Sequence, residues 1–514
     1  MDLHSPQAAN SLPQFSRSYW LDSEPPRTFP PLQEDIEVDY AIVGAGMTGV
    51  TLAYLLTAEG HRVALLEARD PVHGTTGHTT AKVTVQHDLI YHELAEHFGS
   101  AQARLYYQAN EEALQFIKRT VAELRIDCGW AEEEAVLYAQ TVEGARLLDQ
   151  EYEACRRLGI PVEKTGEIPL PLRVEKALKL AGQAQFHPAA YMNALIGRIT
   201  DAGGLIYGQT RIIGKVEEGE RPVLNTTDGR RITCRHAVAC SHFPFHDGLG
   251  LYFARLHPER SYIIAAKPAA AYPGGMYLSV DGPKRSLRSV MIDGEPMVLI
   301  GGDSHKTGQG DPTEEHYRNL EQFGRETLGI EAIPYRWSAQ DLQTLDKLPY
   351  VGMLTSQHTN IWVATGFRKW GMTNGTAAAL LLNDLLTGRP NAYSDLFAPS
   401  RFKIDPGMRN LIKENVNVAA QLIKGKFQSV SQEAERLGPD EGAVVQVKDG
   451  RAGAYRDADG VLHLVDTTCT HMGCELNWNG GERSWDCPCH GSRFDYKGNV
   501  LEGPAMRPLN KIEE

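Results

Sequence analysis

The sequence predicts a chain of α/β and α+β class that ends in a small all-β domain. Residues 38–68 alternate an apolar strand, a glycine turn, an amphipathic helix and a second apolar strand. Residues 260–302 hold four runs of strand length, and the residues from 442 onward form short strands interrupted by cysteine and histidine pairs. These patterns predict a parallel βαβ sheet, a mixed β-sheet and a compact β module, in that order.

A chain of 514 residues is long enough for roughly two to four domains, each with its own core. We expect an N-terminal extension at 1–36 and a large unit of two interleaved subdomains at 37–400. A helical linker is expected at 401–441, where helical spacing gives way to a charged segment, and the β module follows at 442–514.

The charge balance narrows the possible partners. The chain carries 52 basic and 65 acidic residues, a net charge of −13, and no lysine- or arginine-rich run stands out. This argues against nucleic acid as a partner. We see no apolar run long enough to span a bilayer and no export signal, so we expect no membrane span and a cytoplasmic location.

Residues 39–67 form the first βαβ unit, and each part of it suits a dinucleotide. Gly44 permits a tight turn after the strand, Gly46 lets the backbone approach a pyrophosphate, and Gly49 lets the helix pack on the strand. The helix N-terminus presents free N–H groups to the phosphates. Glu67 ends the second strand, where a carboxylate accepts hydrogen bonds from a ribose. The unit predicts a Rossmann-like dinucleotide-binding domain.

Two further segments favour FAD over NAD as the dinucleotide. The Gly/Thr-rich loop at 74–81 offers N–H and hydroxyl donors to pyrophosphate and flavin. A strand at 360–365 runs into a glycine turn, and a glycine-rich helix start follows at Gly371, where the helix dipole suits a reduced flavin. The predicted cofactor-binding residues are Gly44, Gly46, Met47, Thr48, Gly49, Glu67, Ala68, Arg69, Gly74, Thr75, Thr76, His78, Thr79, Thr80, Ala81, Gly366, Phe367, Gly371, Met372 and Thr373.

No second strand–GxGxxG–helix unit occurs between residues 100 and 340. A reductase that draws electrons from NAD(P)H would need a nucleotide site there, so the pattern argues against that class. Residues 90–160 instead predict mainly helices, and residues 204–302 predict strands and hairpins.

Two pairs of cysteine and histidine lie in the C-terminal module, in the segments Cys469-Thr-His471 and Cys487-Pro-Cys489-His490. Two thiolates and two imidazoles are the ligand set of a Rieske [2Fe-2S] centre, a one-electron carrier. A structural zinc site is the alternative, because Zn²⁺ accepts the same donors. Two extra cysteines and the Gly-Pro-Ala run at 503–505 favour the iron–sulfur cluster.

Residues 38–400 resemble the flavoprotein superfamily of glycine oxidase, sarcosine oxidase and D-amino-acid dehydrogenase. The resemblance rests on the Gly44/Gly46/Gly49 motif, Glu67, the GTTGHTT loop and the segments Val363-Ala-Thr-Gly-Phe and Gly371-Met-Thr. The whole chain resembles a bacterial subgroup in which such a flavoprotein is fused to a C-terminal Rieske domain. This implies FAD and a [2Fe-2S] cluster as cofactors.

Resemblance to Rieske proteins also implies the role of each cysteine and histidine. Cys469 and Cys487 would be the thiolate ligands, and His471 and His490 the imidazole ligands. In Rieske proteins of the cytochrome bc type, a pair that matches Cys474 and Cys489 forms a disulfide across the two ligand loops.

The same resemblance suggests candidate catalytic residues in the strand-rich region. Arg288 lies where related enzymes bind a substrate carboxylate, and Tyr262 and His305 would flank the same pocket. His78 matches the spacing of a histidine that bonds covalently to flavin in dimethylglycine and sarcosine dehydrogenases, with Gly77 where those proteins have tryptophan. Lys369 is a candidate cation beside the flavin.

The expected function is an FAD-dependent oxidoreductase, a dehydrogenase of an amine, amino acid or related small molecule. Electrons would pass from FAD to the Rieske cluster and on to an unidentified external acceptor protein. One alternative is an electron-transfer reductase, driven by NAD(P)H or by a partner protein, that feeds an oxygenase. Another is a sensor or scaffold with a regulatory cluster. Substrate and direction of electron flow stay open.

Overall fold

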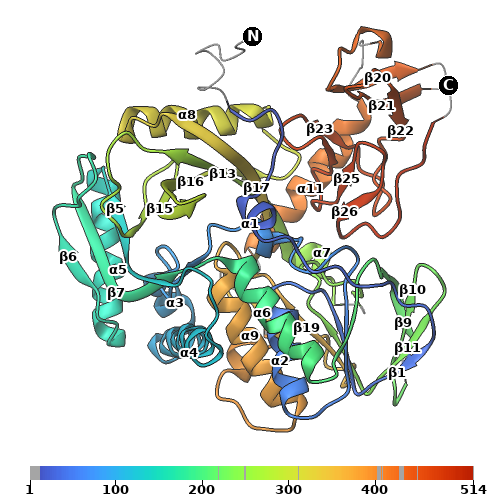
Figure 1. Cartoon of the computed structure of the whole chain (residues 1–514), viewed down its shortest axis with the longest axis horizontal. Helices are drawn as coiled ribbons and strands as arrows, with labels where there is room; N and C mark the ends of the chain where they lie inside the picture. The colour runs from blue at the N-terminus through green and yellow to red at the C-terminus, as the bar shows by residue number, and fades with distance from the viewer. Residues whose placement is uncertain are drawn as a thin grey trace.

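A computed structural model gives the fold of the chain (Figure 1). It describes residues 12–217, 219–247, 250–310, 312–401, 407, 409–427, 433–447 and 450–512. Two large sheets with their helices form the flavoprotein-like part of the chain, and the C-terminal β module packs against one side of it. Among the described residues, no helix is both long and apolar enough to cross a membrane.

A six-stranded sheet carries the predicted βαβ unit. Its strands are mostly parallel and largely buried, because one face packs against helices and the other against the small sheet within residues 212–233. Helix α2 packs against both α6 and α9. In sheet order the strands are β18 (Tyr350–Met353), β19 (Ile361–Thr365), β12 (His236–Ala239), β2 (Tyr40–Val43), β3 (Val63–Leu66) and β8 (Leu205–Tyr207). The helices are α2 (Met47–Ala58), α6 (Pro188–Asp201) and α9 (Gly371–Leu386).

The second sheet is mixed and has nine strands. Helix α8 (Thr313–Leu328) packs against β13 and β16, above the sheet in Figure 1. In order the strands are β17 (Ala332–Thr344), β13 (Leu256–Lys267), β16 (Glu295–Lys306), β15 (Arg285–Ile292), β14 (Met276–Ser279), β5 (Ala131–Ala139), β7 (Lys176–Gln185) and β4 (Lys82–Val83), with β6 (Glu163–Thr165) beside β7. Helix α5 (Val142–Leu158) packs against β5 and β7, and α3 (Tyr91–Phe98) and α4 (Ser100–Leu124) pack against each other and against α5.

The N-terminal segment contributes to the core, although the sequence predicts an extension there. Trp20, in α1 (Tyr19–Ser23), is 1% exposed, and its Nε1 donates to the Thr79 carbonyl at 2.7 Å. Strand β1 (Ile36–Glu37) opens a small sheet with β11 (Arg231–Thr233), β10 (Val223–Thr226) and β9 (Ile212–Glu217). The predicted extension therefore supports the loop at 74–81. Its residues 1–11 lie outside the described residues.

The C-terminal module consists of two small antiparallel sheets. Helix α11 (Arg409–Phe427) falls in the predicted linker and packs Val418 and Leu422 against the module's core; residues 402–406, 408 and 428–432 of the linker lie outside the described residues. One sheet holds β20 (Glu441–Val447), β21 (Gly450–Arg456) and β22 (Leu462–Val465). The other holds β23 (Asn477–Asn479), β24 (Ser484–Asp486), β25 (Arg493–Asp495) and β26 (Val500–Glu502).

Candidate cofactor sites

The glycines of the βαβ turn stand where a side chain would collide with backbone. Gly44 has φ +106°, and a Cβ there would lie 2.4 Å from the Cys240 carbonyl oxygen. A Cβ on Gly49 would lie 1.9 Å from the Gly44 carbonyl oxygen. Glu67 accepts hydrogen bonds from the backbone N–H groups of Ala45 at 2.9 Å and Arg69 at 3.0 Å, so its carboxylate is fixed beside the turn.

The Gly/Thr-rich loop is held against the same turn by side chains from distant segments. The Thr76 hydroxyl accepts a hydrogen bond from the N–H of Met47 at 3.0 Å, at the first residue of α2. Trp337 Nε1 donates to the His78 carbonyl at 3.0 Å. His78 Nδ1 contacts the Gly74 carbonyl at 2.9 Å, and burial lowers the pKa of this imidazole. These contacts hold the loop beside the turn.

These segments enclose one cavity of about 560 Å³, within the size range of small-molecule sites. All but four of the predicted cofactor-binding residues line it. The four that do not line it are Gly49, Ala81, Gly366 and Thr373. The Thr373 hydroxyl, for example, donates to the Thr84 carbonyl at 3.0 Å. A direct contact between these four residues and FAD stays a prediction.

Of the three predicted catalytic residues, Tyr262 is among the residues that line the cavity, whereas Arg288 and His305 are not. The Arg288 guanidinium donates to the carbonyls of Ala81 at 2.9 Å and Phe186 at 3.4 Å, and burial lowers its pKa to about 9. The hydroxyl of Tyr262 contacts Nε2 of His305 at 2.9 Å, and its ring packs on the face of the sheet that α8 covers. The side chains of Arg288, Tyr262 and His305 thus have partners within the protein, and their role at a substrate stays a prediction.

Several cations that the sequence did not single out also line the cavity, and Arg368 and Lys82 are two of them. Arg368 has a left-handed backbone, with φ 58°, and its Nε and Nη1 atoms are buried without a hydrogen-bond partner. Lys82 is 8% exposed, and its Nζ donates to the Tyr277 carbonyl at 2.8 Å. Burial lowers the pKa of Lys82 to about 7. Lys369, which was predicted near the flavin, also lines the cavity and pairs with Glu259 at 2.6 Å.

The cysteine and histidine pairs of the C-terminal module meet at the tips of two tight loops. Backbone hydrogen bonds close each loop, from the Cys469 N–H to the Cys474 carbonyl and from the Cys487 N–H to the Ser492 carbonyl, both at 2.8 Å. The rings of His471 and His490 lie 5.0 Å apart, centre to centre. A third segment joins them, because the N–H of Ala505, in the Gly-Pro-Ala run, donates to the Ser492 hydroxyl at 3.0 Å.

The donor set fits a two-iron cluster. The Nδ1 atoms of His471 and His490 are buried and have no hydrogen-bond partner, which suits atoms that bind a metal. Cys469 and Cys487 are free and buried. Their sulfurs interact, which lowers the pKa of Cys469 to about 7 and raises that of Cys487. Two thiols and two unpartnered imidazole nitrogens are the predicted ligand set.

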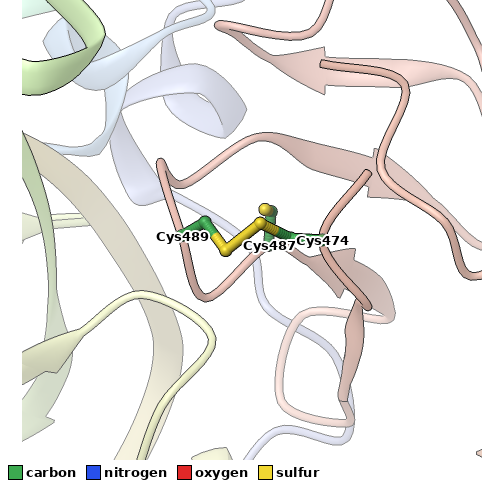
Figure 2. Close-up of side chains that lie close together, drawn as sticks. All are labelled: Cys474, Cys487 and Cys489. Atoms are coloured by element: carbon green, nitrogen blue, oxygen red, sulfur yellow. A yellow bond between two sulfur atoms is a disulfide. The ribbon is translucent and has the colours of Figure 1, made fainter. Parts of the chain in front are cut away.

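Cys474 and Cys489 form a disulfide that links the two ligand loops, as the resemblance implies (Figure 2). Their sulfurs lie close to that of Cys487, so the three cysteines form a compact sulfur group. A disulfide sulfur is no thiolate ligand. Of these three residues, only Cys487 is therefore a candidate metal ligand.

The two sites share strands β13 and β17. On β17, Asp341 lines the cavity, whereas Gln340 turns to the opposite face and donates from Nε2 to the carbonyl of Gly491, next to His490, at 2.9 Å. On β13, Glu259 lines the cavity, and Arg260 lies 4.0 Å from Asp486 of the C-terminal module. Alternate residues of a strand face opposite sides. The same two strands thus separate the cavity from the candidate cluster site.

The cluster histidines also rest against the flavoprotein-like part of the chain. Phe253, in the short helix α7 (Tyr252–Arg255), packs its ring edge-on against His471 at 6.1 Å and His490 at 5.7 Å. Burial lowers the pKa of His490 to about 4.

Comparison with known families agrees with both sites. Residues 39–385 match the family described as FAD dependent oxidoreductase, and residues 428–513 match the Rieske [2Fe-2S] domain. The chain belongs to the FAD-dependent oxidoreductase family. It carries a C-terminal Rieske domain, and its cofactors are FAD and a [2Fe-2S] cluster. The family match confirms the predicted fold class, and it favours the iron–sulfur cluster over zinc.

Relatives support the two-part architecture. YhfW of Bacillus subtilis (strain 168), named as a Rieske 2Fe-2S iron-sulfur protein, is 49% identical over 96% of this chain and 97% of its own length. The cytochrome b6-f complex iron-sulfur subunit 2 of Nostoc sp. (strain PCC 7120 / SAG 25.82 / UTEX 2576) is 51% identical over 57 residues, which cover 11% of this chain and 32% of that protein.

Solved structures support the fold of the larger part. Glycine oxidase from Geobacillus kaustophilus has a TM-score of 0.60 at 22% identity, covering 71% of this chain and 99% of that chain. L-proline dehydrogenase from P. horikoshii has a TM-score of 0.61 at 17% identity, covering 72% of this chain and 98% of that chain.

Proposed function

We propose that this chain is a dehydrogenase that oxidises a small amine or amino acid and passes the electrons through its Rieske cluster to an external acceptor protein. FAD, when bound, supplies a two-electron acceptor that can release electrons singly. We assign FAD to the cavity bounded by Gly44, Glu67 and the loop at 74–81, and the cluster to Cys469, His471, Cys487 and His490.

The observation that carries this proposal is the wall shared by the two sites. The Thr75 hydroxyl, in the loop assigned to FAD, donates to the Gln340 carbonyl at 3.2 Å. The Gln340 side chain donates to the carbonyl of Gly491, beside the cluster ligand His490. One buried residue thus contacts both cofactor sites. An electron carrier fixed this close to the flavin site supports transfer within the chain.

The cations of the cavity support an anionic group on the substrate. Arg368 has buried nitrogen atoms without partners, and no carboxylate pairs with Lys82 among its described contacts. Glu259 lies near enough to interact electrostatically with Arg368, but these nitrogen atoms lack hydrogen bonds, and a substrate carboxylate would supply them. We propose that Arg368 orients the substrate carboxylate, a role for which Arg288 was the sequence candidate.

A reductase driven by NAD(P)H has less support. Within the described residues, the six-stranded sheet is the one that combines parallel strands with a GxGxxG turn. That turn belongs to the βαβ unit that we assign to FAD. Residues 301–308 are also glycine-rich, but they lie in β16 of the mixed sheet and in the turn that follows it.

The test is an anaerobic titration of the holoenzyme with a panel of amines and amino acids, with NADH and NADPH as rival reductants. Flavin absorbance reports reduction of FAD, and a Rieske-type EPR signal reports reduction of the cluster. We expect an amine or amino acid to bleach the flavin and raise the EPR signal. Reduction by NAD(P)H alone would instead make the chain a reductase, and the lack of turnover with any reductant would favour a sensor.

A further inference from the structure

One loop of the Rieske module lines the same cavity as the dinucleotide motif. Residues 501–506 begin within β26 and continue past its end. They line the cavity together with Gly44 and Glu67. Nη2 of Arg211 donates to the Val500 carbonyl at 3.1 Å, at the start of this loop. Met506 packs against the apolar cluster of the nucleotide-binding sheet. The cavity is therefore incomplete without the Rieske module.

The charge on this loop is balanced before any ligand binds. Glu502 is its one acid, and its carboxylate lies 2.8 Å from Arg493 and 3.7 Å from Arg260, which is 1% exposed. A lone carboxylate would repel the pyrophosphate of a dinucleotide. With that charge paired, the rest of the loop offers apolar side chains that exclude water from the cavity: Leu501, Pro504, Ala505 and Met506.

We propose that loop 501–506 is part of the FAD-binding wall, so that the docked Rieske module holds the flavin cofactor in place. The module then has a second task besides carrying electrons. FAD binding and docking of the module are coupled, and coupling between two binding events acts equally in both directions. This inference rests on the assignment of the cavity to FAD but not on the substrate or the direction of electron flow.

Two neighbouring glycines allow docking to be perturbed from outside the cavity. Gly308 has φ +69°, and a Cβ there would lie 2.7 Å from the Pro488 nitrogen and 2.9 Å from the Cys487 carbonyl carbon of the Rieske module. Gly310 has φ +93°, but the nearest atom to its Cβ is His305 Nδ1 at 3.8 Å. Gly308→Ala therefore pushes on the module, whereas Gly310→Ala introduces similar backbone strain without that collision.

The experiment measures the Kd for FAD of the full-length apoprotein, from the quenching of FAD fluorescence, with the Rieske EPR signal as a check that the module is folded. We expect Gly308→Ala to raise the Kd at least about tenfold relative to Gly310→Ala. Met506→Ala removes side-chain atoms from the wall and leaves the docking contacts at Pro488 unchanged. It should raise the Kd for FAD about tenfold, the effect expected when about two buried methylene-sized groups lose contact.

The possible outcomes distinguish a failure of the role proposed for loop 501–506 from a failure of the assignment of FAD to the cavity. If Gly308→Ala and Met506→Ala bind FAD as tightly as Gly310→Ala, the loop is no part of the cofactor site. If Gly308→Ala does not fold, Met506→Ala alone decides the question. If the wild-type chain takes up no FAD at all, the assignment of the cavity itself is wrong.

Discussion

Gln340 offers the sharpest test of the shared wall. It is 1% exposed, its Nε2 donates to the Gly491 carbonyl at 2.9 Å, and its Oε1 accepts from the Thr307 hydroxyl at 2.7 Å. Gln340→Leu keeps the approximate volume but leaves both partners buried without a hydrogen bond. Each unsatisfied group costs about 1–3 kcal/mol, so we expect the free energy of unfolding of the Rieske module to fall by about 3 kcal/mol.

Urea unfolding of the holoenzyme, followed by the visible circular dichroism of the cluster, measures this loss. Gln322→Leu is the matched control, because Gln322 bonds only to Glu326 on the exposed side of α8 among its recorded contacts, and surface changes usually stay within about 0.5 kcal/mol. We also expect slower reduction of the cluster after flash reduction of the flavin in Gln340→Leu. A variant as stable as Gln322→Leu, with unchanged transfer, would refute the role of Gln340 as a contact between the two sites.

Three further predictions concern single side chains. Cys487→Ser should abolish the Rieske EPR signal, whereas Cys155→Ser, at a buried free cysteine remote from the cluster, should retain it; equal signals would contradict the ligand assignment. Arg368→Met should raise KM for a carboxylate substrate at least about tenfold, and an unchanged KM would exclude that contact. Folding lowers the pKa of Lys82 from 10.5 to about 7, so between these pH values the unfolded chain binds more protons and stability rises with pH. Lys82→Met should therefore be more stable than wild type by about 3 kcal/mol near pH 7, after allowing about 1 kcal/mol for the lost hydrogen bond. Urea unfolding should show this gain shrinking toward pH 10, and a gain independent of pH would show that burial of the charge is not its cause.

The sequence indicated both cofactors correctly because their binding motifs are local. The close approach of Gly49 to the Gly44 carbonyl and the helix that begins there depend on residues a few positions apart. Each cluster loop is closed by its own backbone hydrogen bonds, such as the one from Cys487 to Ser492. Such segments keep their shape in any fold that contains them, so spacing alone predicts their chemistry.

The surroundings of the substrate candidates depend instead on contacts between segments that are distant in the sequence. Arg288 lies in a strand, as predicted, but its side chain is captured by the carbonyls of Ala81 and Phe186, which are distant in sequence. Tyr262 sits on the face of β13 that packs under α8. The sequence could have indicated Arg368, because it follows the glycine turn at Gly366. Only the structure shows that its Nε and Nη1 atoms have no hydrogen-bond partner.

By itself the sequence therefore determined the fold class, the two cofactors and the ligands proposed for the cluster. Tertiary structure alone decided that β13 and β17 stand between the two sites, that Trp20 supports the loop at 74–81, and that residues 501–506 line the cavity. The physical reason is the range of the interactions. Motif geometry comes from hydrogen bonds between near neighbours in the chain, whereas a shared wall depends on packing between segments hundreds of residues apart, which no local pattern encodes.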